Sequence, residues 1–346
     1  MSFKYFLFLF LFLFVLPETV RSQNGGQNSF SFLNIEHSPR IEALGGGPIS
    51  IIDDDVSMIQ SNPSLLNSKM HNEVYFSFVD YFSDINLFSF SFVHEFKKIG
   101  VFGLSLKSVS YGDFERNDQI GSNNGFFNAN DQVISFGLSK KLLNYILLGV
   151  NFNILNSNYE SYSSFGLAAN IGITYFDESK KLYSSIIIKN LGRQLSYYNF
   201  EQEKLPFEIQ FAITRELKYL PFKYFLSYDN INNFDISSIY KLKVQTNIES
   251  GSPQIIDESI AKTLLRHVTI GGELNPFRKS LFLRGGFNFQ RRFDLTTDAY
   301  PAMIGFSWGI GFRVSKYFFD YSRSVYHLSG SPNNFSIATN LSTFGL

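Results

Sequence analysis

The stretch from Phe165 to Tyr175 alternates apolar residues with small ones, and this pattern limits what the chain can fold into. Successive side chains of a strand point to opposite faces, so one face is apolar and ends in aromatic rings. The other face carries only Gly166, Ala168, Asn170, Gly172 and Thr174. A core on that face would bury very little apolar area. The apolar face must therefore look into lipid, and about eleven residues suit a tilted strand that crosses a bilayer.

The same alternation recurs along the chain, for example at 134–139, 148–154 and 304–313. Short and long connections alternate between such segments, which is typical of a bacterial outer-membrane barrel with short inner turns and long outer loops. The sequence therefore predicts an all-β fold, a transmembrane antiparallel β-barrel of about 14 strands over residues 71–346. The predicted strand cores are 73–80, 85–95, 99–109, 131–140, 144–156, 165–176, 182–190, 206–216, 221–229, 267–275, 280–291, 302–313, 315–326 and 334–345.

The composition agrees with a surface that is partly lipid. The chain has 40 Phe and 19 Tyr, while charged residues make up 17%, below the usual quarter. Its 30 basic and 30 acidic residues cancel and form no basic cluster, so we expect no nucleic-acid partner. Cysteine is absent, which excludes disulfides and thiolate metal sites.

The N-terminus has the form of a signal peptide. Lys4 precedes the apolar run 5–16, and a short polar region with Ser22 follows Pro17. We predict a signal peptide over residues 1–22 and cleavage before Gln23. Because no later stretch has eighteen consecutive apolar residues, export leaves a soluble secreted protein or a barrel in the outer membrane, and the alternation favours the barrel.

Residues 23–70 lack the alternation and are predicted to form a leader and a plug. The cluster Asp53 to Asp55 has the form of a helix N-cap, and Asn62-Pro63 would end that helix. A barrel of fourteen strands would leak unless something filled its lumen. We therefore place this segment inside the barrel, with Arg40 paired to inward carboxylates or plug carbonyls, and we expect both chain ends at the periplasmic face.

Motifs that carry catalytic or ligand chemistry are missing. Gly45 to Gly47 lacks the Lys-Ser/Thr of a phosphate loop, and the aspartate cluster lacks the spacing of a calcium loop. The five histidines are dispersed, and no Gly-x-Ser-x-Gly elbow occurs. We predict no catalytic, cofactor or metal site and no enzyme.

The longest predicted loop, about 230–266, holds one candidate interaction surface. Ile256, Ile260 and Leu264 follow at i, i+4 and i+8, the spacing of a short amphipathic helix. Such a stripe could pack on the barrel rim, or it could dock another envelope protein.

Beyond these residue patterns, the chain resembles a known family. Phe30-Ser31-Phe32-Leu33, Ser38-Pro39-Arg40, the aspartate cluster and Asn62-Pro63-Ser64 precede a fourteen-strand pattern. This order is similar to the PorQ/PorV branch of FadL-like barrels, from the type IX secretion system, and its length favours the PorQ side. Pro39 and Ser64 depart from the family's usual motif. The matching plug-motif residues are Arg40, Ala43, Leu44, Gly45, Gly46, Asp55, Asn62 and Pro63.

The resemblance implies a non-enzymatic function without cofactors. It implies an outer-membrane component, in contact with outer-membrane lipid, that anchors the surface attachment complex linking secreted cargo to lipopolysaccharide. Its implied partners are PorZ-like, PorU-like (sortase) and PorV-like proteins. The alternative is a FadL-like outer-membrane transporter of hydrophobic small molecules.

Overall fold

We describe the protein from a computed structural model. The structure describes residues 28–118, 122–199, 202–236, 244–246, 253–255, 259–277, 280–296, 303–326 and 330–345. The expected signal peptide and Ile256 lie outside these ranges. None of the helices in the described ranges has the length and apolarity needed to span a membrane.

Within the described residues, fourteen antiparallel strands form one closed barrel, and β1 closes it by pairing with β16. Each predicted strand core overlaps one observed barrel strand, so the predicted fold is confirmed. A separate hairpin joins β10 (Val244–Thr246) to β11 (Pro253–Ile255). The barrel strands are β1 (Glu73–Asp80), β2 (Asn86–Phe96), β3 (Gly100–Asn117), β4 (Asn123–Leu143), β5 (Ile146–Tyr159), β6 (Tyr162–Asp177), β7 (Leu182–Ser196), β8 (Glu208–Glu216), β9 (Phe222–Tyr228), β12 (Val268–Leu274), β13 (Leu281–Asn288), β14 (Phe306–Val314), β15 (Tyr317–Ser324) and β16 (Asn333–Asn340).

The apolar face of the strands looks outward. Along β6, Ile173 and Tyr175 are exposed, whereas Asn170 and Thr174 are buried against the lumen. The same exposure of Phe, Leu and Ile recurs around the barrel, for example at Phe152 in β5. An outer belt of this kind fits the hydrocarbon of a membrane, and a closed barrel leaves no sheet edge unpaired there.

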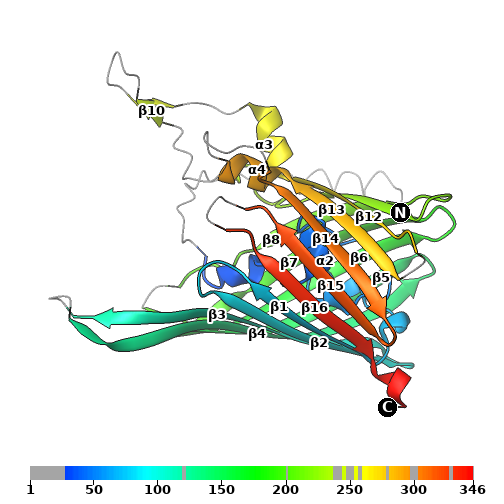
Figure 1. The fold of residues 1–346 in the computed structure, drawn as a ribbon, viewed down its shortest axis with the longest axis horizontal. Coiled ribbons are helices and arrows are strands. Elements are labelled where there is room, and N and C mark those ends of the chain that lie inside the picture. Colours follow the sequence, from blue (N-terminus) through cyan, green and yellow to red (C-terminus); the bar gives the residue numbers. More distant parts are fainter. Residues whose placement is uncertain are drawn as a thin grey trace, which may run out of the picture.

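Two connections predicted as long loops are strands instead. β3 continues to Asn117 and pairs with β4, which begins at Asn123. A register shift at Gly112, with φ of 81°, marks the point beyond which this pair projects past the barrel as a long hairpin (Figure 1). Likewise, only two residues separate β5 from β6. Neither face of the projecting hairpin is buried. Neither lipid nor lumen therefore imposes on it the alternation by which a strand is recognised in the sequence.

Two predicted strands are shorter than expected. The stretch 280–291 leaves the sheet after Asn288, whose side chain accepts a hydrogen bond from the Arg291 backbone nitrogen at 2.9 Å. This N-cap starts helix α4 (Phe289–Leu295). At the chain end, β16 is followed after Asn340 by the 3-10 helix η5 (Leu341–Phe344).

Residues 28–70, which we call the plug, lie inside the ring of strands (Figure 1). Their short helices begin at side-chain caps: Ser38 accepts from Ile41 N, and Asp55 accepts from Ser57 N at 2.8 Å. The second cap is the helix start that the aspartate cluster predicts. The elements of the plug are α2 (Pro39–Ala43) and the 3-10 helices η1 (Ser31–Asn34), η2 (Val56–Ile59), η3 (Pro63–Leu65) and η4 (Ser68–Met70).

The small inward residues of the barrel let the plug backbone approach the wall. A Cβ added at Gly149 would meet the backbone of Pro63 and Ser64, and one added at Gly172 would meet the Asn62 side chain. The close approach of η3 to β5 and β6 therefore depends on glycine at these positions.

The two ends of the described chain lie at opposite ends of the barrel. Leu341 N donates to Asn72 O at 2.8 Å, beside the short connections. Ser29 N donates to Lys204 O at 2.9 Å, and Lys204 belongs to the long connection between β7 and β8. The plug thus runs through the lumen from the long-connection end to the start of β1. The expectation that both ends lie at the periplasmic face is wrong for this part of the chain.

Candidate functional site

Arg40, on α2, anchors the plug to the barrel wall through buried ion pairs. Its side chain is 4% exposed. Its guanidinium binds Glu273 of β12 through two nitrogens, at 2.9 and 3.0 Å, and Asp53 at 2.6 and 3.0 Å. A third carboxylate, that of Asp55, accepts at 3.0 Å. A buried guanidinium with this many charge-assisted hydrogen bonds holds one geometry.

The network continues along the wall. Glu273 also accepts from Arg284 Nε at 2.8 Å, and Arg284 pairs with Asp320 of β15. Lys223 Nζ of β9 lies 3.3 Å from Asp53. Burial alone would raise the pKa of Asp53, but Arg40 and Lys223 outweigh burial and hold that pKa well below its usual range. The plug is thereby tied to β9, β12, β13 and β15 in the half of the barrel near the short connections.

A second tie lies near the long connections. Arg291 of α4 donates to both oxygens of Glu42, at 2.7 and 3.0 Å, and its guanidinium stacks 4.3 Å from the ring centre of Tyr326. Burial disfavours the charged guanidinium, but Glu42 keeps the pKa of Arg291 above its usual value. α2 is therefore tied to β12 through Arg40 and to α4 through Glu42.

The remaining plug-motif residues make structural contacts with the plug and wall. Ala43 O accepts from Ser307 Oγ at 3.1 Å, and Leu44 packs against Gly286 of β13. Asn62 caps η3 by accepting from Ser64 N at 3.0 Å, and its amide donates to Ile49 O at 2.7 Å. Three other motif residues complete the turns: Gly45 and Gly46 with positive φ, and Pro63 in the first turn of η3.

Ile260 and Leu264 lie on helix α3 (Ile260–Arg266), above the barrel end that carries the long connections (Figure 1). Ile260 is 71% exposed, and Leu264 is also exposed. Lys262 and Arg266 face the other way, toward Phe293 of α4, at 5.4 and 5.6 Å from its ring centre. Positions 260 and 262 are about 200° apart on a helix. The apolar side of α3 therefore faces away from α4.

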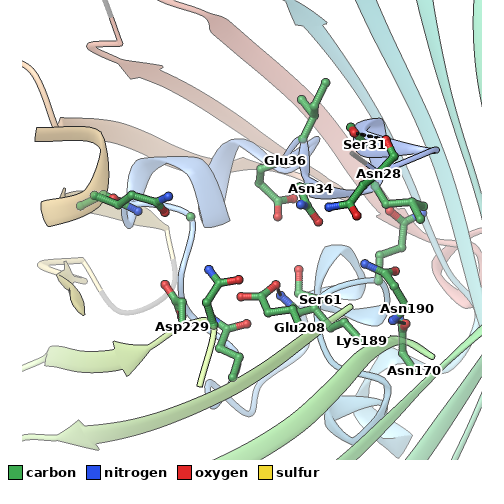
Figure 2. A pocket seen from close by; sticks show the side chains of 18 of the residues that line it. Asn28, Ser31, Asn34, Glu36, Ser61, Asn170, Lys189, Asn190, Glu208 and Asp229 are labelled. Atoms are coloured by element: carbon green, nitrogen blue, oxygen red, sulfur yellow. Dashed lines mark hydrogen bonds and ion pairs between the residues drawn. The ribbon is translucent and has the colours of Figure 1, made fainter. Parts of the chain in front are cut away.

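A polar cavity of about 750 Å³ lies between the plug and the wall, on the side of the long connections. Figure 2 shows Glu36 and Asn34 of the plug across from Glu208 and Asp229 of the wall. Eleven lining residues are Asn or Gln, which disfavours a purely apolar ligand. Burial and the nearby Glu208 raise the pKa of Asp229 to about 7.

No motif in the sequence marks this cavity. Its clearest signal is the run of inward carboxamides, such as Asn153 and Asn170, at positions where a barrel needs only small residues. Within the described residues, no group of three or more His, Asp or Glu is placed to hold a metal ion.

No protein-family model matches the chain, and no curated protein sequence matches it. Solved structures do. The TodX deltaS2S3 mutant monoaromatic hydrocarbon channel is 11% identical, with a TM-score of 0.50, and the match covers 89% of this chain and 100% of that one. The toluene transporter TodX of Pseudomonas putida is 12% identical, with a TM-score of 0.48, and the match covers 88% of this chain and 97% of that one. A FadL homologue of Pseudomonas aeruginosa is 10% identical, with a TM-score of 0.48, and the match covers 88% of this chain and 98% of that one.

Identities this low speak only for the fold. The closed ring of fourteen strands within the described residues and the outward apolar belt are those of proteins that cross the outer membrane with strands. The chain is a multi-pass outer-membrane β-barrel with a FadL-like fold.

Proposed function

We propose that the chain is a non-enzymatic outer-membrane barrel that holds a partner protein at the cell surface. The PorQ/PorV resemblance implies which partner this is: a PorZ-like protein, with a PorU-like sortase and a PorV-like barrel in the same attachment complex. The barrel would then contact lipopolysaccharide only through this complex. The barrel itself would move no substrate.

The observation that carries this proposal is the orientation of α3. A short surface helix normally turns its apolar face toward the protein. Here Lys262 and Arg266 face α4, and Ile260 and Leu264 face away. An apolar strip beyond the lipid belt is typical of a surface that a partner covers. This orientation does not favour the alternative in which the stripe packs on the barrel rim, because the side of α3 next to α4 is the cationic one.

The plug supports the same proposal. Arg40 ties it to Glu273 of the wall and Arg291 ties Glu42 to α4, and buried ion pairs of this kind are costly to break. A barrel filled in this way suits an anchor better than an open pore.

The test is co-purification of the partners with the barrel. Ile260→Asp should abolish recovery of the PorZ-like partner and release secreted cargo into the medium, because a carboxylate at the centre of an apolar contact is costly. Ala261→Asp adds the same charge to an exposed position of the same helix, about 100° away from Ile260, and should leave recovery intact. Barrel assembly in both variants is checked by heat-modifiable gel mobility. Normal cargo attachment in Ile260→Asp cells would contradict the proposal.

The second candidate is transport of hydrophobic small molecules. One observation favours it: the fold likeness to the deltaS2S3 mutant of TodX, a monoaromatic hydrocarbon channel. The carboxamide-rich cavity speaks against an apolar ligand in the lumen. A deletion strain with normal cargo attachment and reduced toluene uptake would establish transport instead.

A further inference from the structure

Among the residues that the structure describes, the lumen cavity contains buried acceptor oxygens without a hydrogen-bond partner. Asn153 Oδ1 and Gln210 Oε1 line it, and their residues are 3% and 1% exposed. Asp229 Oδ1 is a third. Buried polar atoms are nearly always hydrogen-bonded, so three orphaned acceptors around one cavity need an explanation.

The surroundings of these atoms explain why the protein does not satisfy them itself. The Gln210 amide nitrogen is already committed to Gly47 O of the plug, at 3.1 Å, which fixes its oxygen toward the cavity side. In the sheet, Asn153 stands between Ser135 of β4 and Ala168 of β6. The other oxygen of Asp229 accepts from Thr269 Oγ1 at 3.2 Å. The free acceptors therefore come from β5, from β8 and from the residue after β9.

Orphaned acceptors call for a ligand that brings donors. The charge of the lining argues against a strongly cationic one, because four carboxylates stand beside three cationic side chains, and Glu208 already has Lys189 at 3.5 Å. A hydroxyl group donates one hydrogen bond and accepts others, and a carboxamide does both as well. A wall with eleven carboxamides is thus suited to a molecule with many hydroxyls.

The volume of the cavity and the aromatic rings that line it also suit a ligand with many hydroxyls. Its volume of about 750 Å³ lies within the range of small-ligand sites, roughly 300–1,000 Å³. The rings of Tyr81 and Tyr326, which also line it, lie 6.1 Å apart and meet edge to face. Such rings offer an apolar surface with a polar tip, and a sugar ring likewise combines C–H faces with hydroxyl edges.

We propose that this cavity binds a small, uncharged saccharide, with Asn153, Gln210 and Asp229 accepting hydrogen bonds from its hydroxyls. The site goes beyond the proposed anchoring role and does not depend on it, because no residue of α3 takes part.

The experiment measures saccharide binding to the full-length mature barrel in lauryldimethylamine oxide, a detergent without a sugar headgroup. The probes are glucose, galactose, N-acetylglucosamine, maltose and cellobiose, each tested by saturation-transfer NMR and calorimetry. We expect saturable binding of at least one. Spermidine is the cationic comparison, and binding of spermidine but of no saccharide would overturn the proposal. Binding of none of the probes would overturn it too and would leave solvent as the occupant.

Substitutions then locate the site. Asn153→Leu removes an acceptor and should weaken binding about tenfold, the loss expected for one or two hydrogen bonds. Asn153→Asp keeps an acceptor oxygen and should retain most of the affinity. Asn334→Leu is the matched control, because Asn334 is equally buried and also has an orphaned Oδ1, but does not line the cavity. Equal loss in Asn153→Leu and Asn334→Leu would show that the binding lies elsewhere. Gel mobility confirms that each variant is folded.

Discussion

Arg40 and Glu273 are 233 positions apart in the chain, yet their side chains meet inside the barrel through two parallel hydrogen bonds of 2.9 and 3.0 Å. One residue belongs to the plug and the other to strand β12. This pair is the centre of the charge network, so it governs whether the plug stays in place.

Glu273→Ala should loosen the plug while the barrel still inserts. The substitution leaves Arg40 and Arg284 without a shared carboxylate, and removing one partner of a buried pair costs about 3–5 kcal/mol. Single-channel conductance in planar bilayers should rise. Glu216→Ala is the control: it breaks the partly exposed pair with Lys181, which is worth about 1 kcal/mol or less. Equal conductance in the two variants would show that the network does not hold the plug.

The plug should also loosen in acid, in two steps. His37 is buried and its pKa is well below its usual value, because burial and then Lys107 disfavour the charged ring. A released plug binds that proton below pH about 6.5, so stability falls as the pH drops through this value. The pKa of Asp53 is also lowered, so its contribution is lost below about pH 4.

Hydrogen exchange of plug amides against pH measures both steps. His37→Asn keeps a side-chain donor for Ile35 O, which His37 Nδ1 contacts at 3.0 Å, but it cannot titrate. The first step should therefore disappear in this variant and the second should remain. Plug protection that is flat from pH 7 to 5 in the native chain would refute the first step.

Gly149→Ala should displace η3. The added methyl would meet the backbone of Pro63 and Ser64, which cannot turn aside as a side chain could, and overpacking costs roughly 1–3 kcal/mol. Faster proteolysis of the plug and raised conductance are the expected signs. At Gly285 the nearest atom is 4.0 Å from an added methyl, so Gly285→Ala should change neither measurement.

Val150→Arg should destabilise the barrel by roughly 2–4 kcal/mol, because an arginine near the bilayer midplane faces lipid. Val150 is an exposed outward residue of β5. Leu142→Arg places the same charge beside a short connection, where the cost falls to about 0–1 kcal/mol. Urea unfolding in detergent or lipid measures both, and similar losses would mean that the lipid belt lies elsewhere.

The barrel was predictable because lipid and lumen impose different residues on successive positions. Phe165 to Tyr175 shows this directly, and the order of neighbours follows from the short connections. The projecting part of β3 and β4 was not predicted as strand, because it contacts neither the lipid nor the lumen and so shows no alternation. The stretch 289–291 also has a pattern typical of a strand, and only the cap that Asn288 forms on α4 ends β13 before it.

The candidate site was less accessible to sequence reasoning. The spacing of Ile260 and Leu264 predicts a helix, but which side of α3 meets α4 depends on Phe293, about thirty positions later. Several inward carboxylates could have met Arg40, and nothing local distinguishes Glu273 among them. The cavity arises from the distance between plug and wall, which no local pattern encodes.

The path of the plug constrains how the barrel can assemble. Residues 28–70 precede all the barrel strands in the chain, and they contact strands from both halves of the sheet, including β5, β6, β14 and β15. Because the seam between β1 and β16 joins the first and last strands made, the sheet can wrap around a plug already seated on its early strands. Closing the seam first would require forty-odd residues to thread through a finished ring. The pairing of β1 with β16 is thus expected to be the last step of assembly, after the plug has bound its strands.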